Sequence, residues 1–267
     1  MKTLFTMLRM KLIAGFQYRA AAWAGVATQF FWGFMLIMIY EAFYQSSDAV
    51  PPMTLAQLCR YIWLQQAFLH LTMLWQRDGD VLELITSGGI AYELCRPVDL
   101  YGMWFARFLG QRLAGAALRC VPVLAVAAFL PAPYRMTLPE SAAHFALFAA
   151  ALLLSALLGT ALVVLIYVLT VKTLQFAGPS CAVGTLSEFF SGELIAIPFM
   201  PLPLQRIAYA LPFRYLADFP YRLYTGAIPL SEGLVSLGIS AAWTLALIAL
   251  GAGLLRHFLR RAVIQGG

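Results

Sequence analysis

The sequence predicts an all-α membrane protein, a single domain over residues 1–267 with six transmembrane helices. Hydrophobic residues make up 62% of the chain and charged residues only 11%, against about 25% charged residues in soluble domains. Several apolar runs reach the length of about 20 residues that a helix needs to cross a bilayer. These runs are continuous and do not alternate with a period of two, which argues against a membrane β-barrel.

The chain begins with a predicted amphipathic helix over residues 1–20. One face of this helix carries Leu4, Phe5, Leu8, Leu12 and Phe16, and the opposite face carries Lys2, Thr6, Arg9 and Gln17. This pattern is typical of a helix that lies in the membrane interface and is not a cleaved signal peptide. The alternative is a frayed basic tail.

Six apolar segments follow, and Pro, Gly or charged residues mark most of their boundaries. The predicted spans cover residues 23–44, 55–76, 113–130, 142–170, 174–197 and 232–256. The segments between them on one side carry twelve of the eighteen Lys and Arg residues, and those on the other side carry four. The positive-inside rule therefore predicts that both termini and residues 77–112 are cytoplasmic. The net charge of +6 is explained by this topology, and no basic face is free for nucleic acid.

Residues 77–102, the charged insert, are the most polar stretch between the spans. Residues 77–100 contain three of the five Asp residues and two of the seven Glu residues. Leu82, Leu84 and Ile85 predict a short helix on the membrane surface, which ends at Gly88-Gly89, and Arg96-Pro97 set the return to the membrane. We expect the charged side chains of this helix to face outward, namely Arg77, Asp78, Asp80 and Glu83. A helix of this kind suits a soluble partner that pushes on the membrane protein, but a solvated loop without a partner fits equally well.

Residues 198–230, the proline-rich segment, hold six of the fourteen prolines and three arginines that are separated by aromatic residues. The segment is too apolar for an ordinary loop and too interrupted for a span. It predicts short, re-entrant helices on the outer side, which are stable only where protein or a wet cavity satisfies their backbone groups. The alternative is an interfacial segment that is anchored by its aromatic residues.

Five charged side chains fall within or near the predicted spans in positions that bear on function. Glu41 and Arg60 lie near span ends and can reach the interface. Glu188 is deepest, with Glu193 above it, and Arg119 is a possible partner for Glu188. Intramembrane charges are costly and often functional, so Glu188 either lines a translocation path or pairs inside the protein. His70 fits a core histidine better than a proton relay.

The sequence lacks the usual signatures of enzymes and metal proteins. The four cysteines and three histidines are scattered, without a CxxC pair or a ligand spacing. Lys172-Thr173 lacks the glycines that a phosphate-binding loop requires. Asp78 and Asp80 resemble a metal–diphosphate cluster, but such clusters need more carboxylates. We therefore predict no catalytic, cofactor or metal site.

Two stretches resemble a known family. "RDGDVLELITSGGIAYELCRPVDLYGMWFARFLGQRL" resembles the loop between the second and third spans of ABC-2 type permeases, the membrane subunits of ATP-driven exporters. "FFSGELIAIPFMPLPLQRIAYALPFRYLADFPYRLYTG" is similar to the fifth span and outer segment of that family, although Glu193 stands where an apolar residue is expected. With six spans and an N-terminal helix, the resemblance covers the whole chain.

The resemblance implies that the charged insert forms a coupling helix in a groove of a separate ATPase, which binds the ATP and Mg²⁺. The implied contact residues are Arg77, Asp78, Gly79, Asp80 and Glu83, with Arg96 and Pro97 as anchor and Arg9 and Lys11 as further contacts. The proline-rich segment would be the outer gate between two permeases. The implied path and gate residues are Arg119, Glu188, Glu193, Phe199 and Phe213.

The predicted function is therefore the non-catalytic permease subunit of an ABC-2 exporter in a bacterial inner membrane. The expected partners are two ATPase subunits, membrane lipid and a second permease, either identical or different. The alternative is a stand-alone ion-coupled transporter or channel, and a membrane-embedded lipid enzyme is a weaker third class. The sequence does not name the cargo.

Overall fold

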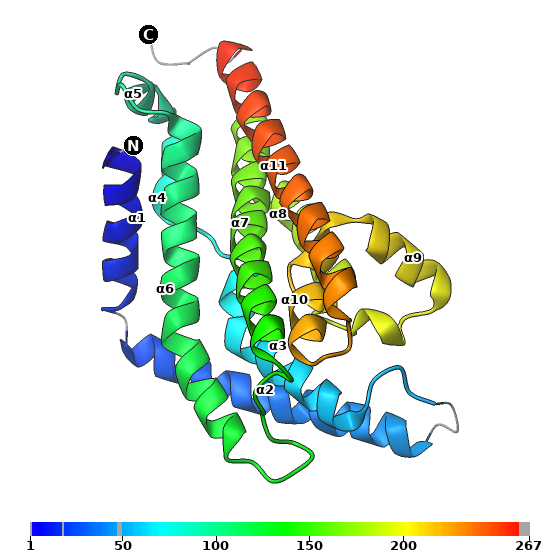
Figure 1. Cartoon of the computed structure of the whole chain (residues 1–267). Coiled ribbons are helices and arrows are strands. Elements are labelled where there is room, and N and C mark those ends of the chain that lie inside the picture. The colour runs from blue at the N-terminus through cyan, green and yellow to red at the C-terminus, as the bar shows by residue number, and fades with distance from the viewer. Residues whose placement is uncertain (1, 18, 47–49, 262–267) are drawn as a thin grey trace.

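The computed structural model describes residues 2–17, 19–46 and 50–261, and all regular secondary structure in these residues is helical (Figure 1). Residues 1 and 18 of the predicted N-terminal helix, and 262–267 of the predicted cytoplasmic end, lie outside the described residues. The helices are α1 (Lys2–Gly15), α2 (Arg19–Ser46), α3 (Leu55–Thr72), α4 (Gly79–Thr86), α5 (Ile90–Leu94), α6 (Leu100–Ala128), α7 (Ala142–Thr173), α8 (Ala177–Phe190), η1 (Ile197–Phe199), α9 (Leu202–Ala210), η2 (Pro212–Tyr215), α10 (Asp218–Tyr224) and α11 (Leu230–Arg261).

Four of these helices are long and apolar enough to cross a membrane. They are residues Trp23–Ser46 of α2, all of α6 and α7, and Leu230–Arg260 of α11. The all-helical class is therefore confirmed, with four candidate spans where the sequence predicts six. The other two predicted spans correspond to α3, which carries several polar side chains, and to α8, whose 14 residues extend for about 21 Å at 1.5 Å per residue.

The long helices do not form one parallel bundle. In Figure 1, α6, α7 and α11 run roughly side by side, whereas α2 runs at a steep angle to them. Helix α3 packs against α2, α6 and α7. Most of its residues between Leu58 and Ala67 are almost fully buried. Because α3 is enclosed by protein, its polar side chains do not have to face lipid.

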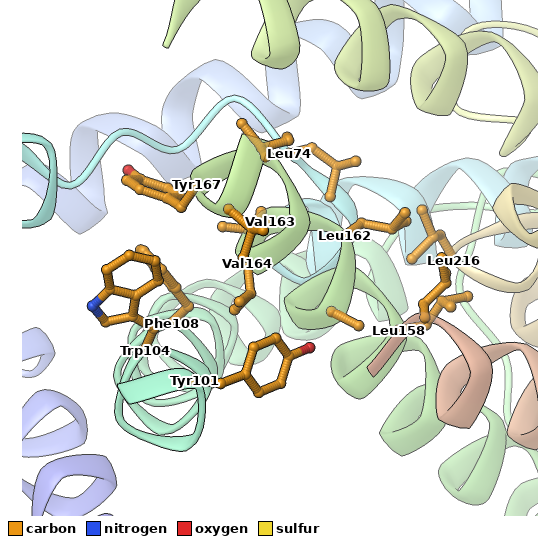
Figure 2. Packing of buried hydrophobic residues seen from close by; sticks show 14 of the residues in the cluster. Leu74, Tyr101, Trp104, Phe108, Leu158, Leu162, Val163, Val164, Tyr167 and Leu216 are labelled. Carbon is orange, nitrogen blue, oxygen red and sulfur yellow. The ribbon is translucent and has the colours of Figure 1, made fainter. Parts of the chain in front are cut away.

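Helix α7 forms the centre of the main core and packs against α11 and α6. Figure 2 shows its residues Leu158, Leu162 and Tyr167 among side chains from α6, from the α3–α4 connection and from the proline-rich segment. The ring of Tyr167 lies 4.6 Å from the ring of Phe108, centroid to centroid. The Oγ of Ser155 donates a hydrogen bond to the carbonyl of Leu216. These contacts attach the proline-rich segment and α6 to the same central helix.

Helix α1 packs lengthwise against α6 (Figure 1). Small residues recur on α6 every four positions, at Gly102, Ala106, Gly110 and Ala114, and small residues let helices approach closely. A Cβ atom at Gly110 would lie 2.8 Å from the carbonyl oxygen of Leu8. Phe5, which the pattern assigns to the apolar face, is 67% exposed. The face of α1 that meets protein is therefore narrower than the predicted apolar face.

Candidate functional site

The charged insert folds into two short helices that a glycine separates. Helix α4 buries Val81, Leu82 and Ile85 in the main core. It ends at Thr86, and Gly88 then adopts a positive φ of 76°, which favours glycine. Helix α5 follows. The predicted short helix and its interruption at Gly88-Gly89 are thus present in the structure.

Asp78 holds the start of α4 against the long helices. Its carboxylate accepts hydrogen bonds from Arg107 at 2.6 and 2.8 Å and from Gln111 at 2.7 Å, and it caps α4 by accepting from the backbone N–H of Val81. Its own backbone N–H donates to the hydroxyl of Tyr167 at 2.7 Å. Burial alone would raise the pKa of Asp78, but the hydrogen bonds from Arg107 and Gln111 lower it below the ordinary value.

The placement of Asp78 differs from the predicted outward orientation. Its side chain is 5% exposed, whereas that of Asp80 is 76% exposed even though Asp80 also pairs with Arg107. Arg77, Gly79 and Glu83 are exposed as well. Asp78 is the N-cap residue of α4. The side chain of an N-cap residue turns toward the backbone of its helix, and here it also turns toward α6. The exposed surface at α4 is therefore formed by Arg77, Gly79, Asp80 and Glu83 and excludes Asp78.

The other predicted contact and anchor residues lie in α1 and in the connection between α5 and α6. Arg96 and Pro97 are exposed, and Arg96 pairs with Glu93 at 3.0 Å. Asp99, and not Arg96, caps the start of α6 by accepting from the N–H of Gly102 at 2.8 Å. In α1, Arg9 is exposed, whereas Lys11 is partly buried and its Cβ faces Gly110 of α6.

Arg112 was missed as a site residue by the sequence analysis, which counted it only as a cytoplasmic charge. Its side chain is among the largest that are fully buried. It donates hydrogen bonds to the carbonyls of Leu71 and Met73, the latter at 2.8 Å, where α3 ends. The available signal was a polar cluster on α6, in which Arg107 and Gln111, four residues apart, lie side by side on one face of the helix, with Arg112 adjacent in sequence. Together they attach the end of α3 and the start of α4 to α6.

A cavity of about 620 Å³ lies between α2, α3, α6 and α8, and is named here the polar cavity. Its polar lining residues include Gln29, Gln65, His70, Arg119, Glu188 and Glu193. Three of the predicted path residues, Arg119, Glu188 and Glu193, thus meet at one cavity. Helix α8 ends at Phe190, and Gly192, at a φ of 87°, turns the chain so that Glu193 reaches the same cavity as Glu188.

The other two predicted path residues lie elsewhere. Phe199 packs against the aromatic rings of Tyr40, Phe43 and Tyr44, with ring centroids 5.1–6.2 Å apart. Phe213 is buried in the main core with α7. Neither lines the polar cavity.

Three glycines make room for the polar walls of the cavity. A Cβ atom at Gly115 would lie 2.0 Å from Cδ2 of His70, and one at Gly25 would lie 2.8 Å from Cζ of Arg119. A Cβ atom at Gly184 would lie 3.1 Å from the indole of Trp75, and this indole donates a hydrogen bond to Glu188. Arg119 contacts His70, with Nη1 3.0 Å from Nδ1. The suggested pairing of Glu188 with Arg119 is therefore replaced by Trp75–Glu188 and Arg119–His70.

The proline-rich segment is folded, and its second half, from η2 through α10, is mostly buried, whereas α9 is mostly exposed. The carbonyl of Gly192 accepts from the hydroxyl of Tyr61 at 3.1 Å, and the N–H of Asp218 donates to the carbonyl of Ser191 at 2.9 Å. Asp218 is fully buried and lies 3.5 Å from Arg222. Hydrogen bonds to backbone carbonyls thus join the turn after α8 to α3 and to the start of α10.

No protein-family model matches the chain, and no curated protein matches it.

Proposed function

We propose that this chain is the permease subunit of an ABC-2 type, ATP-driven exporter. In this proposal it has six spans, with α3 and α8 completing the set, and it lies in a bacterial inner membrane with both termini and the charged insert in the cytoplasm. It pairs with a second permease, and two ATPase subunits bind ATP and Mg²⁺ and contact α4. The chain itself catalyses no reaction.

The observation that carries the proposal is the connection between α4 and the polar cavity. Thr72, Met73 and Leu74, at the end of α3, line the cavity, and Asp78 begins α4 four residues later. Arg112 fixes the end of α3 and Asp78 fixes the start of α4, both on α6. A force on the exposed face of α4 would therefore move the cavity wall, because rigid elements transmit rigid-body motion.

The exposed charges of α4 supply a surface for the ATPase. Asp80 and Glu83 are exposed on α4, and Arg77 precedes them with its guanidinium 5.9 Å from the ring of Phe176. The apolar residues of α4 are buried in the core, so α4 stays attached to the rest of the protein when a partner presses on its exposed face. This arrangement suits a soluble partner better than a solvated loop, whose apolar side chains would have no reason to be buried.

The experiment is copurification from the membranes of the native host, with ATP hydrolysis measured on the purified material. The wild-type chain is expected to carry an ATP-binding cassette subunit. Asp80→Lys together with Glu83→Lys should release it, whereas Glu232→Lys, an exposed charge reversal on α11, should not. A wild-type preparation without any ATP-binding subunit would favour the stand-alone transporter.

Orientation is tested separately with single cysteines in a cysteine-free background. Glu83→Cys and Arg206→Cys both replace exposed residues. In intact cells an impermeant thiol reagent should label position 206 and leave position 83 unlabelled. The reverse pattern would overturn the proposed topology.

A further inference from the structure

The polar cavity contains buried hydrogen-bonding groups that the described chain leaves without partners. Gln29 is 3% exposed and lines the cavity, and neither its Oε1 nor its Nε2 has a hydrogen-bond partner. The Oε1 of Glu193 is also buried and unpaired. Leaving such a group unsatisfied destabilises the fold, and native proteins rarely keep such groups without a reason. Their position in a cavity wall points to a bound molecule.

The charges of the cavity select the sign of that molecule. Glu188 and Glu193 have no salt-bridge partner among the residues that the structure describes. The carboxylate of Glu188 accepts a hydrogen bond from the neutral indole of Trp75, and the guanidinium of Arg119 contacts His70. The carboxylate of Glu188 therefore lines the cavity without a salt bridge to balance it among the described residues. A cation is therefore favoured over an anion or a neutral molecule.

The remaining walls select an apolar body. Trp32, Leu36, Leu69, Met73, Leu74 and Leu194 line the cavity. The volume of about 620 Å³ lies in the range of about 300–1,000 Å³ that is usual for drug-sized ligands. An aromatic face such as that of Trp32 also attracts organic cations. A metal ion would use the carboxylates but would leave these apolar walls without a function.

We propose that the polar cavity binds an amphipathic organic cation with N–H donors. Its cationic end contacts Glu188 and Glu193, a donor reaches Oε1 of Gln29, and its apolar body lies against Trp32 and Leu36. As a statement about cargo, this inference rests on the proposed exporter function. As a statement about binding, it concerns this chain alone.

The test is binding of rhodamine 6G, a cationic amphiphile with N–H groups, to the purified chain in detergent, followed by fluorescence polarisation. Glu188→Gln should raise the Kd about tenfold, which corresponds to about 1.4 kcal/mol, and Gln29→Leu should raise it severalfold. Glu232→Gln, which removes an exposed carboxylate outside the cavity, should leave it unchanged. Fluorescein, an anionic dye of similar ring size, should bind at least tenfold more weakly than rhodamine 6G.

Thermal melting of each variant separates binding from folding. Glu193→Gln joins the comparison if it melts like the wild type, and Glu188→Gln, whose residue is exposed, decides the matter in either case. Unchanged rhodamine 6G affinity in Glu188→Gln, or equal affinity for fluorescein, would overturn the cation site. Binding needs no ATPase, so an intact site without a copurifying ATPase removes the exporter assignment only, and a copurifying ATPase without binding removes the cation site only.

Discussion

The charged insert and the polar cavity both contain several charged side chains, but they differ in whether the buried polar groups have hydrogen-bond partners. At the insert, Asp78 is satisfied by Arg107, Gln111 and the backbone of α4, and Arg112 satisfies two carbonyls at the end of α3. At the cavity, Gln29 and one oxygen of Glu193 are left without partners. A fully satisfied buried network rigidifies a structure, whereas buried polar groups without partners are rare in native proteins and here lie in the wall of a cavity. The difference indicates a rigid connection beside a receptive cavity.

The largest expected effect is the loss of Arg112. Arg112→Met keeps an unbranched apolar side chain but leaves the carbonyls of Leu71 and Met73 buried without donors. We expect a loss of about 3 kcal/mol in the free energy of unfolding, since each unsatisfied buried acceptor costs about 1–3 kcal/mol. The measurement is denaturant unfolding of the purified chain in detergent. A variant as stable as the wild type would show that the end of α3 is held by other contacts.

The next largest effect is expected at Asp78, and Asp80, which pairs with the same Arg107, serves as the comparison. Asp78→Asn should cost about 2 kcal/mol of stability, less than the about 3–5 kcal/mol for breaking a fully buried pair, because Arg107 keeps Asp80 as a partner. Asp80→Asn should change stability by no more than about 0.5 kcal/mol, since exposed ion pairs contribute little. Thermal melting of both variants checks the contrast. Equal effects of the two changes would mean that burial does not distinguish the partners.

A smaller effect is expected at the cavity wall. Gly115→Ala places a Cβ 2.0 Å from the ring of His70, so the ring must shift and its contact with Arg119 must change. We expect about 1 kcal/mol of destabilisation, at the low end of the cost of overpacking, together with altered rhodamine 6G affinity. Gly238→Ala on α11 is the matched control, because its Cβ meets nothing within 4 Å. Unchanged rhodamine 6G affinity in Gly115→Ala would show that the position of His70 does not affect binding in the cavity.

The smallest effect concerns pH. The folded-state pKa of Asp78 is lowered, so its stabilisation is fully present above the unfolded value of about 3.9 and is lost as pH falls through the folded pKa. The difference in melting temperature between wild type and Asp78→Asn should therefore stay constant from pH 8 to about pH 5 and shrink only below about pH 4. A difference that already shrinks between pH 8 and pH 6 would indicate that another group is responsible.

Local patterns in the sequence predicted part of this structure. The apolar runs gave the helical class, Gly88-Gly89 the interruption of the insert, and the charges at 119, 188 and 193 the residues of the cavity. The tertiary contacts of individual side chains could not be predicted from the sequence. Neither the inward turn of Asp78 nor the role of Arg112 follows from sequence, because each depends on where α6 lies. Spans for α3 and α8 were predicted from apolar content alone, which shows neither that neighbouring helices enclose α3 nor that α8 ends after 14 residues.

In the proposed mechanism, movement of α4 reaches the cavity wall through Asp78. The most direct measurement uses a bimane fluorophore at Met73→Cys, which lines the cavity, in a chain without its four native cysteines and in complex with the copurified ATPase. ATP should change the fluorescence in the wild-type background. Asp78→Asn should abolish this change while ATP binding to the ATPase persists. No response to ATP in the wild type, or an undiminished response in Asp78→Asn, would contradict the account.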